Sequence, residues 1–253
     1  MIKKQYPHGV IYNGNCFDIL PTLEQKTAEI AITSPPYNLN KSCGSGGSTG
    51  MEKRYKNWYP DEVNEYAYIG QQKHLIYLLS RICKSSIFYN HRIRYAWHPR
   101  NKIQPASKMF HPYEIVKDFP VWCDITWNRK AIGNPIKNRF YTQTEKIYQL
   151  YRPKYFNNDK KYSDLWTINP SKTPEHPCSF PEEIPKRCIE TTTKVNDVVL
   201  DPYMGLGTSI ISAVKNNRNF IGIEKDKKYF DIAVQKLDYF YKQLQLDFNV
   251  GNQ

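Results

Sequence analysis

The C-terminal third of the chain carries the pattern that most restricts its fold. A short apolar run at 198–200 leads through a glycine turn into a helical pattern at 208–215, a second apolar run at 219–224 and an amphipathic helical pattern at 227–244. This order of strand, turn, helix, strand and helix is typical of a parallel sheet with helices on both faces. We therefore expect an α/β protein with a Rossmann-like, doubly wound and mostly parallel sheet.

The glycine turn has the properties of a nucleoside-binding site. Asp201 ends the first strand, and Gly205 and Gly207 allow backbone N–H groups to approach a ligand closely. Glu224 ends the next strand, where an acid can accept hydrogen bonds from ribose hydroxyls. Because Ile210 stands where the dinucleotide fingerprint has its third glycine, we expect another nucleoside cofactor. A purely structural turn is the alternative.

A second candidate site follows an apolar run at 28–33. The diproline of Ser34-Pro35-Pro36-Tyr37 ends this strand and provides carbonyl groups without competing N–H donors. The Ser34 hydroxyl and the Pro35 carbonyl can accept hydrogen bonds from an amino group, and Tyr37 can stack on a planar ring. Both turns follow carboxyl ends of strands, so they can face one cleft. A rigid turn without function is the alternative here.

The residues between the two sites contain fewer regular patterns. Helical spacing covers 61–83, and short runs at 86–90, 121–127 and 146–151 predict strands. The stretch 128–174 is polar and rich in Asn, Tyr and Pro, so we expect it to be mostly irregular.

The positive charge of the chain is concentrated in its middle. Of the 36 Lys and Arg residues, 23 lie within 38–175 together with 11 of the 24 acidic residues, so this segment carries the whole net charge of +12. A basic block between neutral ends favours a polyanion such as nucleic acid. A solvated basic surface is the alternative.

Composition argues against several other classes of protein. The mean hydropathy is −0.68, and no apolar stretch approaches the length of about 18 residues that a membrane span needs. The six cysteines form no C-x-x-C pair, which argues against a disulfide framework or a zinc site and fits a reducing compartment. Residues 1–12 show no apolar leader, so we expect a cytoplasmic protein with no metal and no membrane partner.

Several motifs together resemble one family. T-S-P-P-Y at 33–37 and D-P-Y-M-G-L-G-T at 201–208 resemble the catalytic and cofactor motifs of the exocyclic-amino DNA methyltransferases. The pattern I-G-I-E-x₄-Y-x-x-I-A-x-x-x-L at 221–237 is similar to that family's cofactor half, and the segments 86–92 and 124–130 look like its following strands. The catalytic motif precedes the cofactor motif, as in the β group of this family.

The resemblance implies one methyltransferase domain with a seven-stranded sheet that has one antiparallel strand. In the β group, the segment that recognises the target lies between the two motifs, where the basic block is found. The expected parts of the domain 1–253 are a catalytic half (1–37 and 61–127), a flexible loop (38–60), a target-recognition insert (128–174) and a cofactor-binding half (175–253).

The resemblance also implies the cofactor S-adenosylmethionine. His176-Pro177 with Phe180-Pro181 is similar to a motif that caps the cofactor, and Asn15-Cys16 resembles an N-terminal G-D-C element in which Asn15 replaces the usual acid. The residues that this resemblance assigns to cofactor binding are Asn15, Cys16, His176, Phe180, Asp201, Pro202, Tyr203, Gly205, Gly207, Thr208, Glu224 and Lys225.

The implied reaction begins with extrusion of a base from the DNA duplex into the cleft. Tyr37 would stack on this base, while the Ser34 hydroxyl and the Pro35 carbonyl would accept hydrogen bonds from its amino group; with Pro36, these residues form the expected catalytic turn. Direct transfer of the methyl group requires neither a covalent enzyme intermediate nor a metal, so catalysis would consist of positioning and electrostatics.

The target base remains open between two choices. Ser34 at the first position of the motif is typical of N4-cytosine enzymes, whereas Asn38 directly after Tyr37 is frequent in N6-adenine members. An RNA or protein amide methyltransferase is a weaker alternative, because such enzymes usually carry Asn first and have the other motif order. A DNA-binding relative without activity is disfavoured, since both motifs are intact.

Double-stranded DNA is the expected partner, and a homodimer and a cognate restriction endonuclease are further candidates. Most basic side chains would contact phosphates, and only a few can read bases. The residues expected to bind DNA are Lys41, Lys53, Arg54, Arg92, Arg129, Lys130, Lys137 and Arg139.

Overall fold

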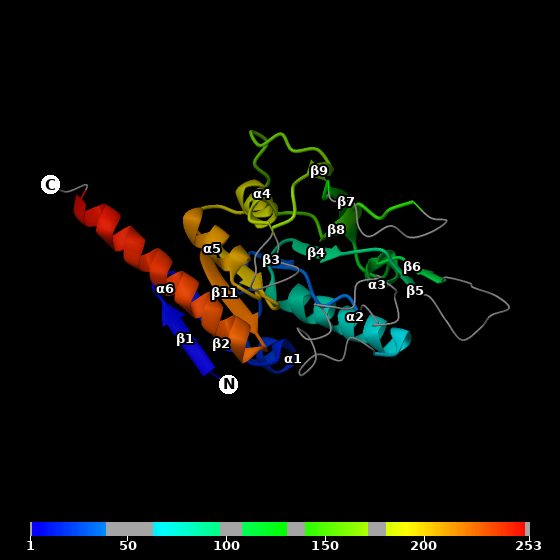
Figure 1. Ribbon diagram of the computed structural model, residues 1–253, viewed down its shortest axis with the longest axis horizontal. Helices are drawn as coiled ribbons and strands as arrows, with labels where there is room; N and C mark the ends of the chain where they lie inside the picture. Colours follow the sequence, from blue (N-terminus) through cyan, green and yellow to red (C-terminus); the bar gives the residue numbers. More distant parts are fainter. Residues whose placement is uncertain (1, 39–62, 97–107, 131–139, 172–180, 251–253) are drawn as a thin grey trace.

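A single mixed sheet forms the centre of the molecule (Figure 1). The computed structural model describes residues 2–38, 63–96, 108–130, 140–171 and 181–250. The strands of the sheet are β1 (Ile2–Tyr6), β2 (Gly9–Asn13), β3 (Ile30–Thr33), β4 (Ile87–His91), β7 (Val121–Asn128), β8 (Thr144–Leu150), β9 (Leu165–Thr167), β10 (Val198–Asp201) and β11 (Asn219–Glu224).

The nine strands lie in the order β1-β2-β11-β10-β3-β4-β8-β7-β9. The five from β2 to β4 are mutually parallel, and β8 runs antiparallel to both of its neighbours, β4 and β7. The seven strands from β2 to β7 thus form the predicted sheet with one antiparallel strand. The predicted number of strands was too low, because β1 extends the sheet at one edge and β9 at the other.

The helices confirm the main helical predictions. The patterns at 61–83, 208–215 and 227–244 correspond to α2, α5 and α6, of which α2 is shorter and α6 longer than expected. The helices are α1 (Cys16–Ile19), α2 (Glu65–Ile82), α3 (Tyr113–Val116), α4 (Glu183–Thr192), α5 (Thr208–Lys215) and α6 (Lys227–Val250), with a 3₁₀ turn at Leu20–Thr22 and a small antiparallel pair of strands, β5 (Arg94–Ala96) and β6 (Lys108–Phe110).

Helices cover both faces of the sheet. Successive side chains of a strand point to opposite faces. In β3, Ile30 and Ile32 pack in a core with residues of α4, α5 and α6, whereas Ala31 packs in a second core with residues of α1, α2 and α3. All four residues of β3 are buried, as expected for a parallel strand covered on both sides. This arrangement is the predicted doubly wound α/β fold. Among the described residues, no helix is long and apolar enough to cross a bilayer.

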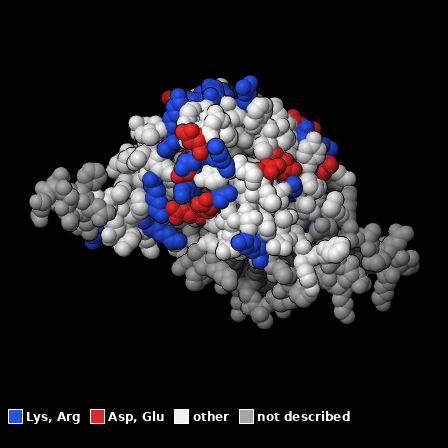
Figure 2. Space-filling view, turned by 90° about the horizontal axis from the view of Figure 1, so that it is seen from above, with Lys and Arg blue, Asp and Glu red and all other residues white. Residues whose placement is uncertain are grey.

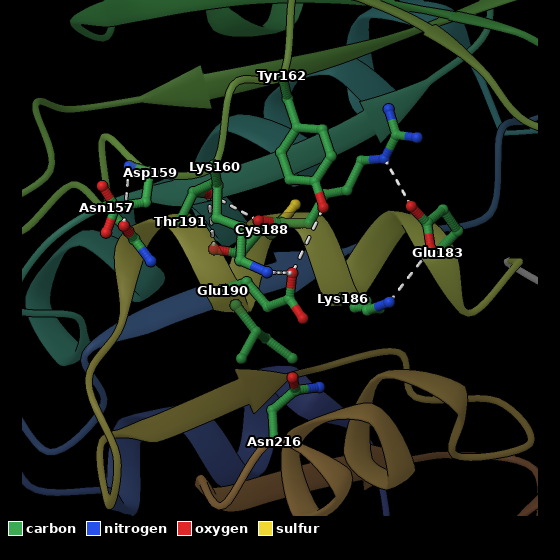
Figure 3. Close-up of polar contacts among 12 residues, drawn as sticks. Asn157, Asp159, Lys160, Tyr162, Glu183, Lys186, Cys188, Glu190, Thr191 and Asn216 are labelled. Carbon is green, nitrogen blue, oxygen red and sulfur yellow. Dashed lines mark hydrogen bonds and ion pairs between the residues drawn. The ribbon is translucent and has the colours of Figure 1, made fainter.

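The connection between β8 and β9 packs on α4 (Figure 3). The Lys160 ammonium lies 3.1 Å from the Glu190 carboxylate, and the Tyr162 hydroxyl donates a hydrogen bond to the same carboxylate at 3.4 Å. The Arg187 guanidinium lies 4.5 Å from the centre of the Tyr162 ring. The described part of the segment 128–174, which the sequence predicted to be mostly irregular, thus supplies β8 and β9 to the sheet and contacts α4; its role as a target-recognition insert stays a prediction.

Charged side chains of both signs share the side of the molecule that Figure 2 shows. Lys and Arg form several groups there, with Asp and Glu between them. The basic excess of the chain therefore does not form one continuous patch on the described part of this face.

Candidate active site

The catalytic turn predicted from the sequence lies at the carboxyl edge of the sheet. It follows Thr33, the last residue of β3, and β3 pairs in parallel with β10 through Ala31 and Leu200. The carboxyl ends of these strands, which carry Ser34 and Asp201, therefore lie on one edge, where ligands of open α/β sheets bind. The structure thus places the two predicted turns on neighbouring strands.

The hydroxyl groups of Ser34 and Tyr37 belong to one hydrogen-bonded cluster. Their oxygens lie 2.8 Å apart. Ser34 Oγ lies 3.1 Å and Tyr37 Oη 2.6 Å from Asn90 Oδ1, to which each can donate. Tyr37 Oη can also donate to Glu145 Oε2 at 3.0 Å, while Arg129 Nη1 donates to Glu145 Oε1 at 3.0 Å. Neither Asn90 nor Glu145 was predicted from the sequence.

A neutral histidine packs against the tyrosine ring of the turn. His91 at the end of β4 is buried, and burial lowers its pKa to about 3. Its ring centre lies 4.7 Å from that of Tyr37. Its Nδ1 lies 2.8 Å from the Arg92 carbonyl, which can only accept, so Nδ1 carries the hydrogen and Nε2 is left as an acceptor 2.8 Å from the Tyr68 hydroxyl. His91 therefore supports Tyr37 by packing rather than by exchanging protons near neutral pH.

Asn38 closes the turn with its side chain directed into the protein. It is buried and has a positive φ of 52°. Its Nδ2 donates to the Val63 carbonyl at 2.9 Å, its Oδ1 accepts from the Val63 N–H at 3.0 Å, and its carbonyl accepts from Arg94 Nη1 at 3.0 Å. Arg94 is itself paired with Glu65 at 2.6 Å. The Asn38 amide is thus used within the chain.

The glycine turn is shaped by the carboxylate at the end of β11. Glu224 Oε2 accepts from the Gly205 N–H at 2.9 Å, and Glu224 Oε1 accepts from the Asp226 N–H at 2.7 Å. Gly205 and Gly207 have φ angles of 52° and 80°, in the left-handed region that favours glycine. Gly207 directly precedes the first residue of α5. These conformations explain why both glycines stand in the turn.

Two buried acids lie beside this turn. Asp201 accepts from the Tyr203 N–H at 3.0 Å and from the Ser209 hydroxyl. Both Asp201 and Glu224 are 7% exposed, and burial raises the pKa of each to about 7. A bound cation, or donors such as ribose hydroxyls, would favour the ionised forms. The two carboxylates therefore fit a ligand that carries positive charge and hydroxyl groups.

The N-terminal element joins the same corner. The Gly14 N–H donates to the Glu224 carbonyl at 3.0 Å, and the Asn15 side chain caps α1 by accepting from the Phe17 N–H at 3.2 Å. Cys16 is buried, which raises the pKa of its thiol to about 11 even though a hydrogen bond to Tyr203 acts in the opposite direction. The structure thus brings Asn15 and Cys16 to the predicted cofactor turn.

Some of the remaining predicted residues lie in the described part of the chain, and the others lie outside it. Pro202 is buried, Thr208 is the first residue of α5, and Lys225 is exposed. Of the predicted DNA contacts, Lys130 is exposed and Arg92 half-buried, whereas Arg129 already has Glu145 as a partner. The predicted residues outside the described part of the chain are Lys41, Lys53, Arg54, Lys137, Arg139, His176 and Phe180.

An open cavity of about 400 Å³ lies away from the site, near the start of β7. It is at the amino ends of the parallel strands, whereas the catalytic turn is at their carboxyl ends. Its lining residues are Trp122, Arg152, Pro153, Lys154, Phe156 and Asn158. Within the described residues, no group of three or more His, Cys, Asp or Glu side chains is placed to hold a metal ion.

Comparisons with known proteins agree with this geometry. The chain is 28% identical over 263 residues to the type II methyltransferase M.BglII of Bacillus subtilis (90% of this chain, 68% of the relative). It is 25% identical to M2.LlaDCHI of Lactococcus lactis subsp. cremoris (94% and 93% covered). The fold matches the solved structure of PvuII DNA methyltransferase (cytosine-N4-specific), with a TM-score of 0.71, 16% identity and coverage of 91% and 86%.

A second solved structure, a putative DNA modification methylase from Thermus thermophilus complexed with S-adenosylmethionine, matches with a TM-score of 0.65 and 19% identity, covering 89% of this chain and 91% of that one. A family model described as DNA methylase matches residues 28–235, which include both turns of the site. The chain therefore belongs to the N6/N4 DNA methylase family.

Proposed function

We propose that the protein is a site-specific DNA methyltransferase that transfers a methyl group from S-adenosylmethionine to the N4 amino group of cytosine. The observation that carries this proposal is the position of the Ser34–Tyr37 turn and of the Asp201–Glu224 acid pair at one edge of the sheet. One turn offers acceptors for an amino group beside a tyrosine ring. The other offers buried acids for a cationic nucleoside.

The residues around the glycine turn suit S-adenosylmethionine. Its sulfonium and amino groups are positive, and its ribose has two hydroxyl donors, which matches the need of Asp201 and Glu224 for positive charge or donors. When bound, S-adenosylmethionine supplies an electrophilic methyl group. The left-handed glycines leave room for a ligand to approach the backbone.

The catalytic turn would prepare the target amino group. Ser34 Oγ and the Pro35 carbonyl would accept hydrogen bonds from its two N–H groups. This would direct the nitrogen lone pair out of the ring plane. The nitrogen would give this pair to the methyl carbon as the bond between that carbon and sulfur breaks, with the bonding electrons remaining on sulfur, and the proton that the nitrogen loses would pass to solvent water. Positioning of this kind accounts for much of the rate enhancement in direct transfers.

Cytosine is favoured over adenine by two observations. Ser34 occupies the first motif position, as is typical of N4-cytosine enzymes, and one structural relative is named as cytosine-N4-specific. Asn38, the residue that favoured adenine, has its amide occupied by Val63. The alternative is methylation of adenine at N6.

The relatives are named type II methyltransferases. We therefore propose a cognate restriction endonuclease as a partner of this protein and the cytoplasm as its location; a homodimer is a further candidate.

The identity of the product tests this proposal. Unmethylated DNA is incubated with the protein and S-adenosylmethionine labelled in its methyl group, then digested to nucleosides and analysed by mass spectrometry. We expect labelled N4-methyldeoxycytidine. Labelled N6-methyldeoxyadenosine would instead support the adenine alternative, and DNA without any labelled nucleoside would contradict both.

Cofactor affinity is expected to depend on pH. Asp201 and Glu224 have pKa values near 7 in the free protein because of burial, so both are increasingly protonated as the pH falls below 7. If the cofactor binds the ionised forms, its affinity is full above about pH 8 and weakens by up to about tenfold per pH unit for each proton taken up below pH 7. Calorimetric titration between about pH 6 and 8 measures this effect, and a pH-independent affinity would contradict it.

A further inference from the structure

Glu145 is a buried carboxylate with partners on both oxygens. It lies on β8, beyond β4 from the catalytic turn, and its side chain is 7% exposed. A buried carboxylate is stable only when it is paired and hydrogen-bonded. Arg129 supplies the charge at 3.0 Å on Oε1, and the Tyr37 hydroxyl lies 3.0 Å from Oε2. Glu145 is thus a fixed acceptor directly behind the catalytic tyrosine.

Asn90 is a second fixed acceptor in this cluster. Its Nδ2 donates to the Lys146 carbonyl at 3.0 Å. Since a carbonyl cannot donate, this bond fixes the orientation of the amide and leaves Oδ1 facing Ser34 and Tyr37. An amide oxygen, like a carboxylate oxygen, can only accept.

The partner of the Tyr37 hydrogen determines whether the Ser34 lone pairs stay available. Ser34 and Tyr37 contribute one hydroxyl hydrogen each. If Tyr37 donates to Glu145, Ser34 donates to Asn90 and its lone pairs remain available. Without Glu145, the Tyr37 hydrogen turns to Asn90 Oδ1, which it approaches more closely than Ser34 does (2.6 Å against 3.1 Å), or to Ser34 Oγ at 2.8 Å. Donation to Ser34 Oγ occupies one of the Ser34 lone pairs and so impairs Ser34 as an acceptor, whereas Asn90 Oδ1 has two lone pairs and can accept from both hydroxyls.

We propose that Glu145, held by Arg129, is a positioning residue. It accepts the hydrogen bond that the Tyr37 hydroxyl donates and so keeps Ser34 Oγ as an acceptor for the target amino group. This inference rests on the proposed methyl transfer to an exocyclic amino group. It also gives Arg129 a role inside the site, whereas the sequence predicted that Arg129 contacts DNA.

A suppression experiment tests this role. Single-turnover rates of DNA methylation are compared for the unmodified protein, Glu145→Ala, Tyr37→Phe and the double variant. We expect Glu145→Ala to reduce the rate by about tenfold or more, in the range of a lost hydrogen bond to a charged group. Tyr37→Phe removes the competing hydrogen, so it should reduce the methylation rate only about threefold. The double variant should then be as fast as Tyr37→Phe alone. Affinities for DNA and S-adenosylmethionine should change by less than about twofold.

Two controls separate positioning from folding. Asp124→Ala removes the Asp124–Lys146 ion pair, which joins β7 and β8 with an oxygen–nitrogen distance of 3.0 Å, and should leave the rate within about twofold. Glu145→Gln keeps an acceptor oxygen for which Tyr37 and Arg129 compete. We therefore expect an intermediate rate that Tyr37→Phe again raises, which remains measurable if Glu145→Ala fails to fold.

The outcomes distinguish this inference from the proposed function. An unmodified protein that methylates no DNA overturns the proposed function and this inference with it. An active protein whose Glu145 variants keep the full rate, or stay slow after Tyr37→Phe, overturns the inference alone. Equal losses of rate and DNA affinity would also overturn it, because they indicate a structural role.

Discussion

Replacing Tyr37 by alanine is expected to reduce the rate of DNA methylation by about 100-fold or more while S-adenosylmethionine binding is unchanged. The substitution removes the ring expected to stack on the extruded base, an interaction of about 1–3 kcal/mol, and loosens the position of the reacting nitrogen. The Tyr37 hydroxyl contacts Ser34, Asn90 and Glu145, which all lie outside the cofactor turn at Asp201. Single-turnover kinetics and cofactor titration measure the two effects separately.

Tyr239→Ala is the matched control for this experiment. Tyr239 lies on α6 and is 67% exposed, so its removal should affect neither quantity. If Tyr37→Ala weakened cofactor binding and catalysis by the same factor, Tyr37 would be supporting the fold of the site rather than holding the base.

Replacing Glu224 by alanine is expected to weaken S-adenosylmethionine binding by about 30-fold or more. The change deprives the Gly205 and Asp226 N–H groups of their acceptor, each at a cost of about 1–3 kcal/mol where it stays buried. It also removes the acid expected to accept ribose hydroxyls. Glu224→Gln keeps the shape and one acceptor oxygen, so we expect its affinity to fall between those of Glu224→Ala and the unmodified protein. Calorimetric titration gives the dissociation constants.

Glu114→Ala serves as the control for the loss of an acid. Glu114 is an exposed residue of α3 that pairs only with Lys117 in the described part of the chain. Thermal unfolding of each variant shows whether the fold persists. A folded Glu224→Ala protein with unchanged cofactor affinity would remove Glu224 from the proposed cofactor site.

The fold was predictable where the sequence pattern is local. The runs before Ser34 and Asp201 and the helical spacing of α5 are apparent within about ten residues, and the structure confirms them. The N-terminal hairpin of β1 and β2 was missed because β1, an edge strand, is mostly polar. Gly9 could have indicated it: a Cβ there would lie 2.1 Å from the Phe220 carbonyl oxygen, so the close approach of β2 to β11 requires glycine.

The site was predictable only where its residues are adjacent in sequence. Ser34 and Tyr37, like Asp201 and Gly205, stand together in short motifs. Asn90 and Glu145 reach Tyr37 from 53 and 108 positions away, through the pairing of β4 with β3 and β8. No periodicity records such a pairing. Polar residues inside a strand that is expected to lie in the middle of the sheet, such as Asn90 in β4, are the signal that could have been used.

The position of β2 and β3 within the sheet has a consequence for how the protein is made. β2 pairs with β1 and β11, and β3 pairs with β4 and β10, so each of these two strands from the first 33 residues of the chain receives one of its two neighbours only from residues 198–224. At about 5–20 residues per second, a ribosome needs roughly 10–40 s to synthesise the intervening chain. During that time the apolar β3 has an unpaired edge that favours aggregation. The same long-range pairing that assembles the candidate site is therefore expected to slow folding.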